Sequence, residues 1–350
     1  TDFLAKPEVD DWYKGIPITF TADDPDGNIT EYAWRVDNGP WNWTTDTSVI
    51  IPPTAWAEPL EEEHIITVIS RDDTYLIDPV GDSIEIEIYV PTFEKDILIL
   101  DGTIEDVSLP NFDGLITDQM TDSAYYEIFG GNRGDLIVDD RDFARRRFPN
   151  FRTIRKYKMV VWIKDHFATV PYFAEESRNL EAYLHAGGKL VMIGSNIMQS
   201  FMDESYYLIA PCEPCIVYPA KFSSSGWNWF MNKILHVNFG YIGNLIGNFN
   251  SADGINGYSG IQLRPDTTKI ANVFPQYNKL SNVDVIIEPG GFTVPILKLN
   301  SDDDYVDQEA CGIRYYGSGF DVIYIGAPIW HMQSEDAKLL GNKILVDMGF

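Results

Sequence analysis

Two side chains in the second half of the chain, Ser195 and His331, are of the types that nucleophilic catalysis requires, and each follows a continuous apolar run. A serine hydroxyl becomes a nucleophile when an imidazole takes its proton and a carboxylate orients that imidazole. Asp165 or Glu335 would supply the carboxylate here. A serine hydrolase is therefore one alternative function for the chain.

The runs that precede these side chains are typical of buried parallel strands, because they are apolar at every position. Helical segments alternate with them, which predicts a doubly wound α/β sheet. Ligands of such sheets bind beyond the carboxyl ends of the strands, so Asp101 and His166 are binding candidates. The expected strands are 96–101, 135–139, 159–163, 189–193 and 321–325, and the expected helices are 117–129, 171–186 and 334–348.

The first 92 residues have a different pattern. Short alternating segments are separated by turns rich in Asp, Asn, Gly and Pro, with no helical period, and this predicts an all-β sandwich. Residues 1–92 therefore form one expected domain, and residues 95–350 form the α/β domain. Residues 205–318 interrupt the α/β domain with a β-rich insertion that is too long for a loop, and we expect it to form its own β layer over one end of the sheet.

A resemblance accompanies the first domain. The run 24–41, Asp-Pro-Asp-Gly-Asn-Ile-Thr-Glu-Tyr-Ala-Trp-Arg-Val-Asp-Asn-Gly-Pro-Trp, and the later run 64–73 resemble the fibronectin-III/PKD-like modules of bacterial exoproteins. The resemblance covers nearly all of residues 8–92. It implies an immunoglobulin-like fold and a role as a spacer or interaction unit.

A second resemblance lies in the α/β domain. The run 181–196, Glu-Ala-Tyr-Leu-His-Ala-Gly-Gly-Lys-Leu-Val-Met-Ile-Gly-Ser-Asn, resembles the helix, turn, strand and elbow of class I glutamine amidotransferases. Residues 312–316 and 321–330 resemble the closing strand of the same group. The resemblance covers most of residues 95–350 outside the insertion, and it implies a flavodoxin-like fold.

The same resemblance implies that amidotransferase catalysis has been lost. Ser195 stands where these enzymes have a cysteine, and His331-Met332-Gln333 stands where they have His-x-Glu. Ile197 replaces the glycine expected two residues after the nucleophile. A serine hydroxyl depends on a well-placed base more than a thiol does, and the Gln333 amide cannot stabilise an imidazolium as a carboxylate would. We therefore expect no catalytic residues, with Ser195, His331, Gln333 and Asp165 as vestiges of a site.

Two pairs of tryptophans have strand spacing, so each pair shares a face if its segment is extended. Exposed indoles would stack on sugars or enter a protein interface, whereas buried indoles would belong to the core. Carbohydrate binding is therefore another alternative function. The pairs are Trp41 with Trp43, and Trp227 with Trp229.

Acidic turns raise the question of calcium. Asp23, Asp24 and Asp26 precede Gly27, but the residues around them do not fit the EF-hand loop, so a solvated turn competes with a Ca²⁺ site. The spacing of Cys212 and Cys215 allows a local disulfide or two free thiols. No glycine-rich nucleotide-binding fingerprint is present, so we expect no cofactor other than possible Ca²⁺.

The formal net charge of −27 opposes binding to nucleic acid or anionic lipid, because both require a cationic surface. Residues 1–92 hold 20 Asp and Glu against 4 Lys and Arg. Residues 141–158, in contrast, hold eight of the 26 Lys and Arg, a cluster that could dock an acidic partner or lie solvated. No apolar stretch is long enough to span a bilayer.

Together these features predict a non-catalytic extracellular or cell-surface protein, its signal peptide already removed. We expect it to act as an interaction or scaffold subunit with other protein subunits of an envelope or extracellular assembly. A glycan is the alternative partner.

Overall fold

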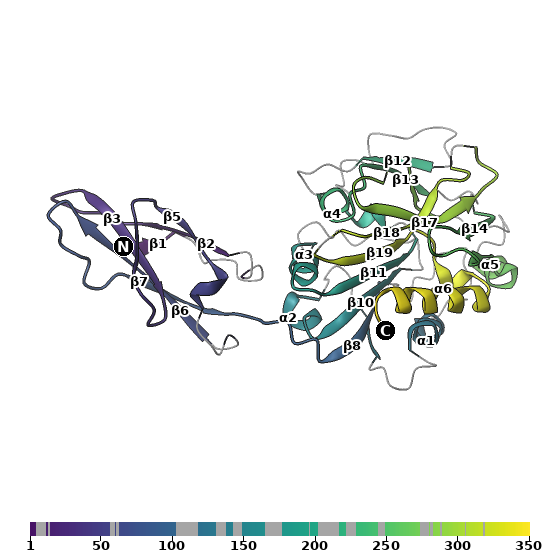
Figure 1. Ribbon diagram of the computed structural model, residues 1–350, viewed down its shortest axis with the longest axis horizontal. Coiled ribbons are helices and arrows are strands. Elements are labelled where there is room, and N and C mark those ends of the chain that lie inside the picture. The colour runs from purple at the N-terminus through teal and green to yellow at the C-terminus, as the bar shows by residue number, and fades with distance from the viewer. Residues whose placement is uncertain are drawn as a thin grey trace. The chain divides into compact units, whose positions relative to one another are not determined.

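The computed structural model describes most of the chain. These residues divide into two compact units, 1–91 (unit 1) and 92–350 (unit 2) (Figure 1). The described residues are 1–4, 12, 15–56, 60, 63–102, 118–130, 138–142, 149–164, 177–195, 197–201, 217–221, 229–243, 249–273, 280, 283–287, 289–304, 306–317 and 319–350.

Unit 1 consists of two antiparallel sheets around an apolar core. Alternate side chains of each strand point inward, so Ile18 and Phe20 meet Tyr32 and Trp34 between the sheets. The described part of unit 1 is therefore built from strands and one 3-10 turn. In spatial order, one sheet contains β1 (Asp2–Phe3), β2 (Ile16–Thr21) and β5 (Ser48–Ile51), and the other contains β4 (Asn42–Thr44), β3 (Ile29–Val36), β6 (Glu63–Asp72) and β7 (Asp82–Glu87), with η2 (Pro53–Ala55) after β5.

Unit 2 is built on one large mixed sheet. Five of its strands are parallel neighbours, and most of their residues are buried because both faces are covered. Their spatial order places the second strand in the chain before the first. The order is β9 (Val138–Asp142), β8 (Lys95–Asp101), β10 (Tyr157–Lys164), β11 (Lys189–Gly194) and β19 (Asp321–Ile325).

The inserted segment extends this sheet instead of forming a separate layer, and the expectation of its own layer over one end was wrong in that respect. Its last strand, β18 (Ala310–Tyr315), pairs antiparallel with β19, so the backbone ladder continues into the insertion. Further strands follow, and a branch leaves β18 through β17. They are β16 (Val285–Ile286), β13 (Phe239–Gly243), β12 (Val217–Lys221), β17 (Thr293–Asn300), β14 (Ser251–Gly254) and β15 (Gln262–Leu263).

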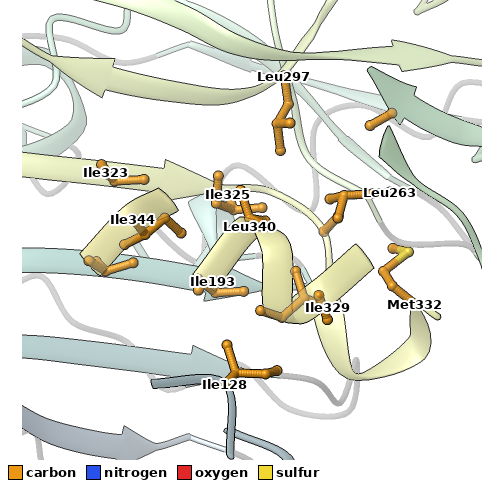
Figure 2. Packing of buried hydrophobic residues seen from close by; sticks show 14 of the residues in the cluster. Ile128, Ile193, Leu263, Leu297, Ile323, Ile325, Ile329, Met332, Leu340 and Ile344 are labelled. Carbon is orange, nitrogen blue, oxygen red and sulfur yellow. The ribbon is translucent and has the colours of Figure 1, made fainter. Parts of the chain in front are cut away.

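Helices contact both faces of the parallel strands. On one face α1 and α6 pack together, and Figure 2 shows Leu340 and Ile344 of α6 beside Ile193 and Ile325 of the sheet. On the other face Trp162 of β10 meets a second set of aromatic rings, described below. The helices are α1 (Asp118–Phe129), α2 (Phe151–Ile154), α3 (Ser177–His185), α4 (Trp229–Lys233), α5 (Thr267–Val273), α6 (Ser334–Asp347), η3 (Met198–Phe201) and η5 (Ile329–His331).

The second aromatic set follows from strand alternation. Met159, Val161 and Ile163 of β10 belong to the core under α1 and α6, so Trp162 between them points to the opposite face. There the Trp162 and Phe201 rings meet edge to face, with centroids 5.7 Å apart. Phe201 in turn stacks on Phe230 of α4, with ring centroids 4.8 Å apart.

None of the described helices is long and apolar enough to cross a membrane.

Candidate functional site

The turn after β11 holds the predicted nucleophile, Ser195. Gly194 before it has φ +149°, and a Cβ there would lie 2.0 Å from the Lys164 carbonyl oxygen, so only glycine fits. The Ser195 amide donates to that same oxygen at 2.7 Å. Ser195 itself is not among the described non-glycine residues with positive φ. It therefore lacks the strained backbone that presents the serine of a nucleophile elbow.

A buried carboxylate from the insertion meets the chain just beyond this turn. Asp284 has no exposed surface, and its side chain accepts hydrogen bonds from the Met198 amide at 3.0 Å and from the Tyr324 hydroxyl. The Asp284 amide donates to the Gly326 carbonyl oxygen at 2.7 Å. The insertion is thus anchored to the segments that follow β11 and β19.

Lys164 provides the opposite charge for Asp284. It ends β10 and is 1% exposed. Burial lowers the pKa of Lys164 and raises the pKa of Asp284, while the attraction between the two charges opposes both shifts. Hydrogen bonds from Tyr324 and Met198 also favour the charged form of Asp284. Lys164, Asp284 and Tyr324 therefore form a buried polar cluster, which we call the edge cluster.

Asp101, a predicted binding residue, ends β8 at the same edge. It is fully buried, and the amide of the next residue, Gly102, donates to the Ile163 carbonyl oxygen at 2.8 Å. Asp101, Lys164 and Ser195 thus lie at the carboxyl ends of three adjacent strands, as the sequence predicts for Asp101 and Ser195. All three are buried. Asp165 and His166 lie outside the described residues.

His331, the predicted base, is fixed by packing at the end of η5. It is 1% exposed, and its ring meets the Trp330 ring edge to face at 4.9 Å. Its carbonyl oxygen accepts from the Asp266 amide. Both Ser195 and His331 are described, and no hydrogen bond joins them. The alternative orienting residue, Glu335, is exposed in the first turn of α6, and Gln333 is exposed at its N-cap.

The candidate sugar-binding tryptophans of unit 1 are stacked on arginines. The Arg35 guanidinium lies 4.4 Å from the Trp41 ring centroid, and that of Arg71 lies 4.4 Å from the Trp43 ring centroid. Each guanidinium occupies one face of its indole, which is the surface that a sugar would need. Trp227 lies outside the described residues, as does the side chain of Trp229.

The calcium candidates Asp23, Asp24 and Asp26 do not form a three-residue metal-binding group. The Asp24 carboxylate instead accepts a long hydrogen bond, 3.4 Å, from the Asp26 amide. Within the described residues no group of three or more His, Cys, Asp or Glu is arranged to hold a metal ion.

The described free cysteine, Cys311, is buried, which raises the pKa of its thiol to about 12 and makes it unreactive. Cys212 and Cys215 lie outside the described residues.

Sequence reasoning missed two features. The edge cluster joins residues far apart in the chain, and its only local signal is a lysine at the end of an apolar strand. In unit 1, the loop between β6 and β7 holds apolar side chains in water although the sequence places two acidic turns there. Tyr75 and Val80 in this loop are 79% and 82% exposed.

The comparisons with known proteins assign no family. No family model matches the chain, and a search of curated proteins also finds no match. Similar solved structures include the fibronectin(III)-like modules of Clostridium thermocellum CbhA, which are 26% identical, with 25% of this chain and 93% of that chain covered and a TM-score of 0.21.

Two further similar structures each cover 73% of this chain. A ThuA-like protein from Bacteroides uniformis is 12% identical, with 73% of this chain and 92% of that chain covered and a TM-score of 0.37. A cold-adapted β-galactosidase from Rahnella sp. R3 is 11% identical, with 73% and 31% covered and a TM-score of 0.41. At these values the likenesses assign no activity to this chain.

Proposed function

We propose that the chain is a non-catalytic interaction subunit of an extracellular or cell-envelope assembly. The observation that supports this most is the use of polar side chains at the carboxyl edge of unit 2. Asp284 accepts hydrogen bonds from Met198 and Tyr324, so it holds the insertion to the sheet, and the charge of Lys164 attracts it. A working site needs the same groups to face a substrate.

The fold that we propose for unit 2 is the doubly wound, flavodoxin-like arrangement of the glutamine amidotransferases. Its support is the strand order β9-β8-β10-β11-β19, which is second, first, third, fourth and fifth along the chain. The helices α1 and α6 on one face and the aromatic rings of η3 and α4 on the other agree with it. For unit 1 we propose an immunoglobulin-like sandwich of the fibronectin-III type.

The hydrolase alternative has less support. Ser195 is buried on an unstrained turn, and no hydrogen bond connects it to His331, which packs against Trp330. The glycan alternative is also weakened for unit 1, because arginines stack on Trp41 and Trp43. An interaction role requires neither a reactive serine nor free indole faces.

Labelling with a serine-reactive fluorophosphonate distinguishes the non-catalytic interaction role from the serine hydrolase alternative. The intact chain and its Ser195→Ala variant are incubated with the reagent, and adducts are located by mass spectrometry. A non-catalytic role predicts no adduct at Ser195 and no turnover of ester or amide substrates. Stoichiometric labelling that is lost in Ser195→Ala and reduced in His331→Ala would overturn the proposal.

Retention on envelopes tests the positive half of the proposal. The purified chain is sedimented with cell-envelope material of its source, either untreated, protease-treated or glycosidase-treated. A protein assembly predicts that retention is lost after protease and kept after glycosidase. The reverse pattern would establish the glycan alternative instead, and absence of retention on untreated envelopes would contradict an envelope assembly.

A further inference from the structure

The loop between β6 and β7 of unit 1 exposes four large apolar side chains. We call residues 72–81 the apolar loop. Tyr75, Leu76, Ile77 and Val80 are 79%, 69%, 48% and 82% exposed. A single exposed apolar side chain is ordinary, but four within six residues form a patch of the kind that marks an interaction site.

The apolar loop is held in place by two aspartates. Asp72 Oδ1 accepts hydrogen bonds from the amides of Thr74 and Leu76, at 2.8 and 2.9 Å. Asp78 Oδ1 accepts from the amides of Val80 and Gly81, at 3.0 and 2.9 Å. These bonds fix the backbone on both sides of the apolar residues. A partner would therefore bind a preformed surface and would lose less affinity to ordering the loop.

The patch continues onto the outer face of the four-stranded sheet. Ile77 forms an antiparallel bridge with Arg71, so the two side chains lie on the same face. The Arg71 guanidinium lies 4.4 Å from the Trp43 ring centroid and 5.9 Å from that of Tyr75. Trp43 is itself 41% exposed. The apolar loop and this indole thus belong to one surface.

Acidic residues surround that surface. Gly27 lies beside both the Asp24 and Asp73 carboxylates, and Asn28 donates to Asp73 at 3.3 Å, so the acidic turn before β3 adjoins the loop. Arg71, at the base of the loop, already forms an ion pair with Glu31. Residues 1–92 carry 20 Asp and Glu against 4 Lys and Arg. The field around the apolar loop is therefore negative. The Asp78 carboxylate also pairs with the N-terminal ammonium of Thr1 at 2.9 Å. The carboxylates of the loop and of the segments beside it are Asp24, Asp26, Asp72, Asp73, Asp78 and Asp82.

We propose that the apolar loop docks onto a cationic amphipathic segment of another protein, with the apolar side of that segment on Leu76, Ile77 and Val80 and its Lys or Arg side chains facing the surrounding carboxylates. This rests on the interaction role proposed above and names the surface and the partner's chemistry. Branched aliphatic side chains do not stack on sugars, and the negative field repels anionic lipid and the same loop of a second copy.

The test uses two synthetic amphipathic peptides, one of Leu and Lys and one of Leu and Glu with the same pattern. Each is titrated into the full chain by calorimetry at two salt concentrations. The test variant is Leu76→Ser with Val80→Ser. The matched control is Leu339→Ser with Val346→Ser, which removes two side chains of similar exposure, 55% and 60%, from α6 in unit 2.

We expect the Leu/Lys peptide to bind the wild type and the control alike, and to bind more weakly at high salt. The loop variant should bind it about tenfold more weakly or worse, because two buried aliphatic contacts are lost. Equal binding of both peptides, or equal binding by wild type and loop variant, would overturn the proposal.

Two further measurements exclude other occupants. If zwitterionic vesicles retain the wild type but not the loop variant, the occupant is a lipid surface. If sedimentation equilibrium shows a wild-type dimer that the loop variant lacks, the occupant is a second copy. Either result overturns the choice of a cationic segment. If the peptide test fails while Ser195 stays unlabelled and envelope retention stays protease-sensitive, only this inference is overturned. A reactive Ser195 would instead overturn the proposed function.

Discussion

The carboxyl edge of unit 2 and the apolar loop of unit 1 use polar and apolar side chains in opposite ways. At the edge, Lys164 and Asp284 are buried, and Asp284 accepts hydrogen bonds from its own chain. In the loop, Leu76 and Val80 are exposed, and Asp72 and Asp78 behind them accept hydrogen bonds from the loop backbone. Groups that could react with a ligand are thus enclosed in unit 2, and groups that could form a core face water in unit 1.

This difference illustrates that the chemical type of a residue does not by itself determine its function. Ser195, His331 and Asp101 have the types of an active site, yet all three are buried. Burying a charge is costly unless it is paired, so removing one member of the edge cluster would leave the other uncompensated. Exposed apolar side chains, in contrast, contribute little to the stability of the isolated chain. Substitutions in the two regions should therefore affect different measurements.

The largest effect is expected at the edge cluster. Asp284→Ala leaves Lys164 buried without its opposite charge and frees the Tyr324 hydroxyl and the Met198 amide. We expect the free energy of unfolding to fall by about 3–5 kcal/mol, the cost of breaking a buried pair from one side. Urea denaturation followed by circular dichroism measures this.

The pH dependence and a double variant check the cause. Burial lowers the pKa of Lys164 to about 8 in the wild type, and the charge of Asp284 opposes that shift. Without Asp284 the pKa of Lys164 falls further, so the variant gains stability from the neutral amine at a pH where the wild type does not yet gain it. The deficit of Asp284→Ala should therefore narrow as pH rises toward about 8. Asp284→Leu combined with Lys164→Met should be closer to wild type than Asp284→Ala alone. A loss below about 1 kcal/mol for Asp284→Ala would contradict a stabilising role for the cluster.

The turn before Ser195 should show the next largest effect. Gly194→Ala places a methyl group 2.0 Å from the Lys164 carbonyl oxygen at φ +149°. We expect a loss of about 3 kcal/mol, from backbone strain and the steric clash together. Gly257→Ala is the matched control, because Gly257 has φ +94° but nothing within 4 Å of the new Cβ. Equal thermal shifts for the two variants would mean that the close approach of β10 and this turn is unimportant.

The sequence predicts the parallel strands of unit 2 well, because continuous apolar runs are strong local signals. The expected strand 321–325 coincides with β19, and the expected helix 334–348 extends α6 by a single residue. The expected strand 135–139 is displaced to 138–142. Its polar residues, Asp-Asp-Arg-Asp, carry no strand pattern, and pairing with β8 sets its position.

The candidate site could be predicted only in part. Parallel strand direction follows from strand–helix alternation, and so Asp101 and Ser195, which follow or end parallel strands, lie at the expected edge. That Asp284 meets Lys164 depends on how the insertion folds back, which no local pattern specifies. The two acidic turns at Asp72 and Asp78 are equally clear in sequence. The exposure of the side chains between them is decided by the packing of the whole sandwich and is not visible in a local run.

Within unit 1, the stack on the outer sheet face should give a smaller effect. Arg71→Ala removes the guanidinium from Trp43 and the ion pair with Glu31. We expect unfolding free energy to fall by about 1 kcal/mol, because both interactions are partly exposed to solvent. Arg71→Lys should keep the ion pair but lose the planar stack, and tryptophan fluorescence reports the change at Trp43. Identical fluorescence in all three proteins would show that the stack does not form in solution.

The smallest effect on stability is expected in the apolar loop, and it completes the contrast with the edge cluster. Leu76→Ser and Val80→Ser should change the free energy of unfolding by less than about 0.5 kcal/mol, because the side chains are exposed in the folded chain as in the unfolded one. Ile66→Ala in the fully buried part of β6 is the control and should cost about 2–5 kcal/mol. A large loss for Leu76→Ser would mean that the loop packs against its own chain, and it would then have no free apolar surface to offer a partner.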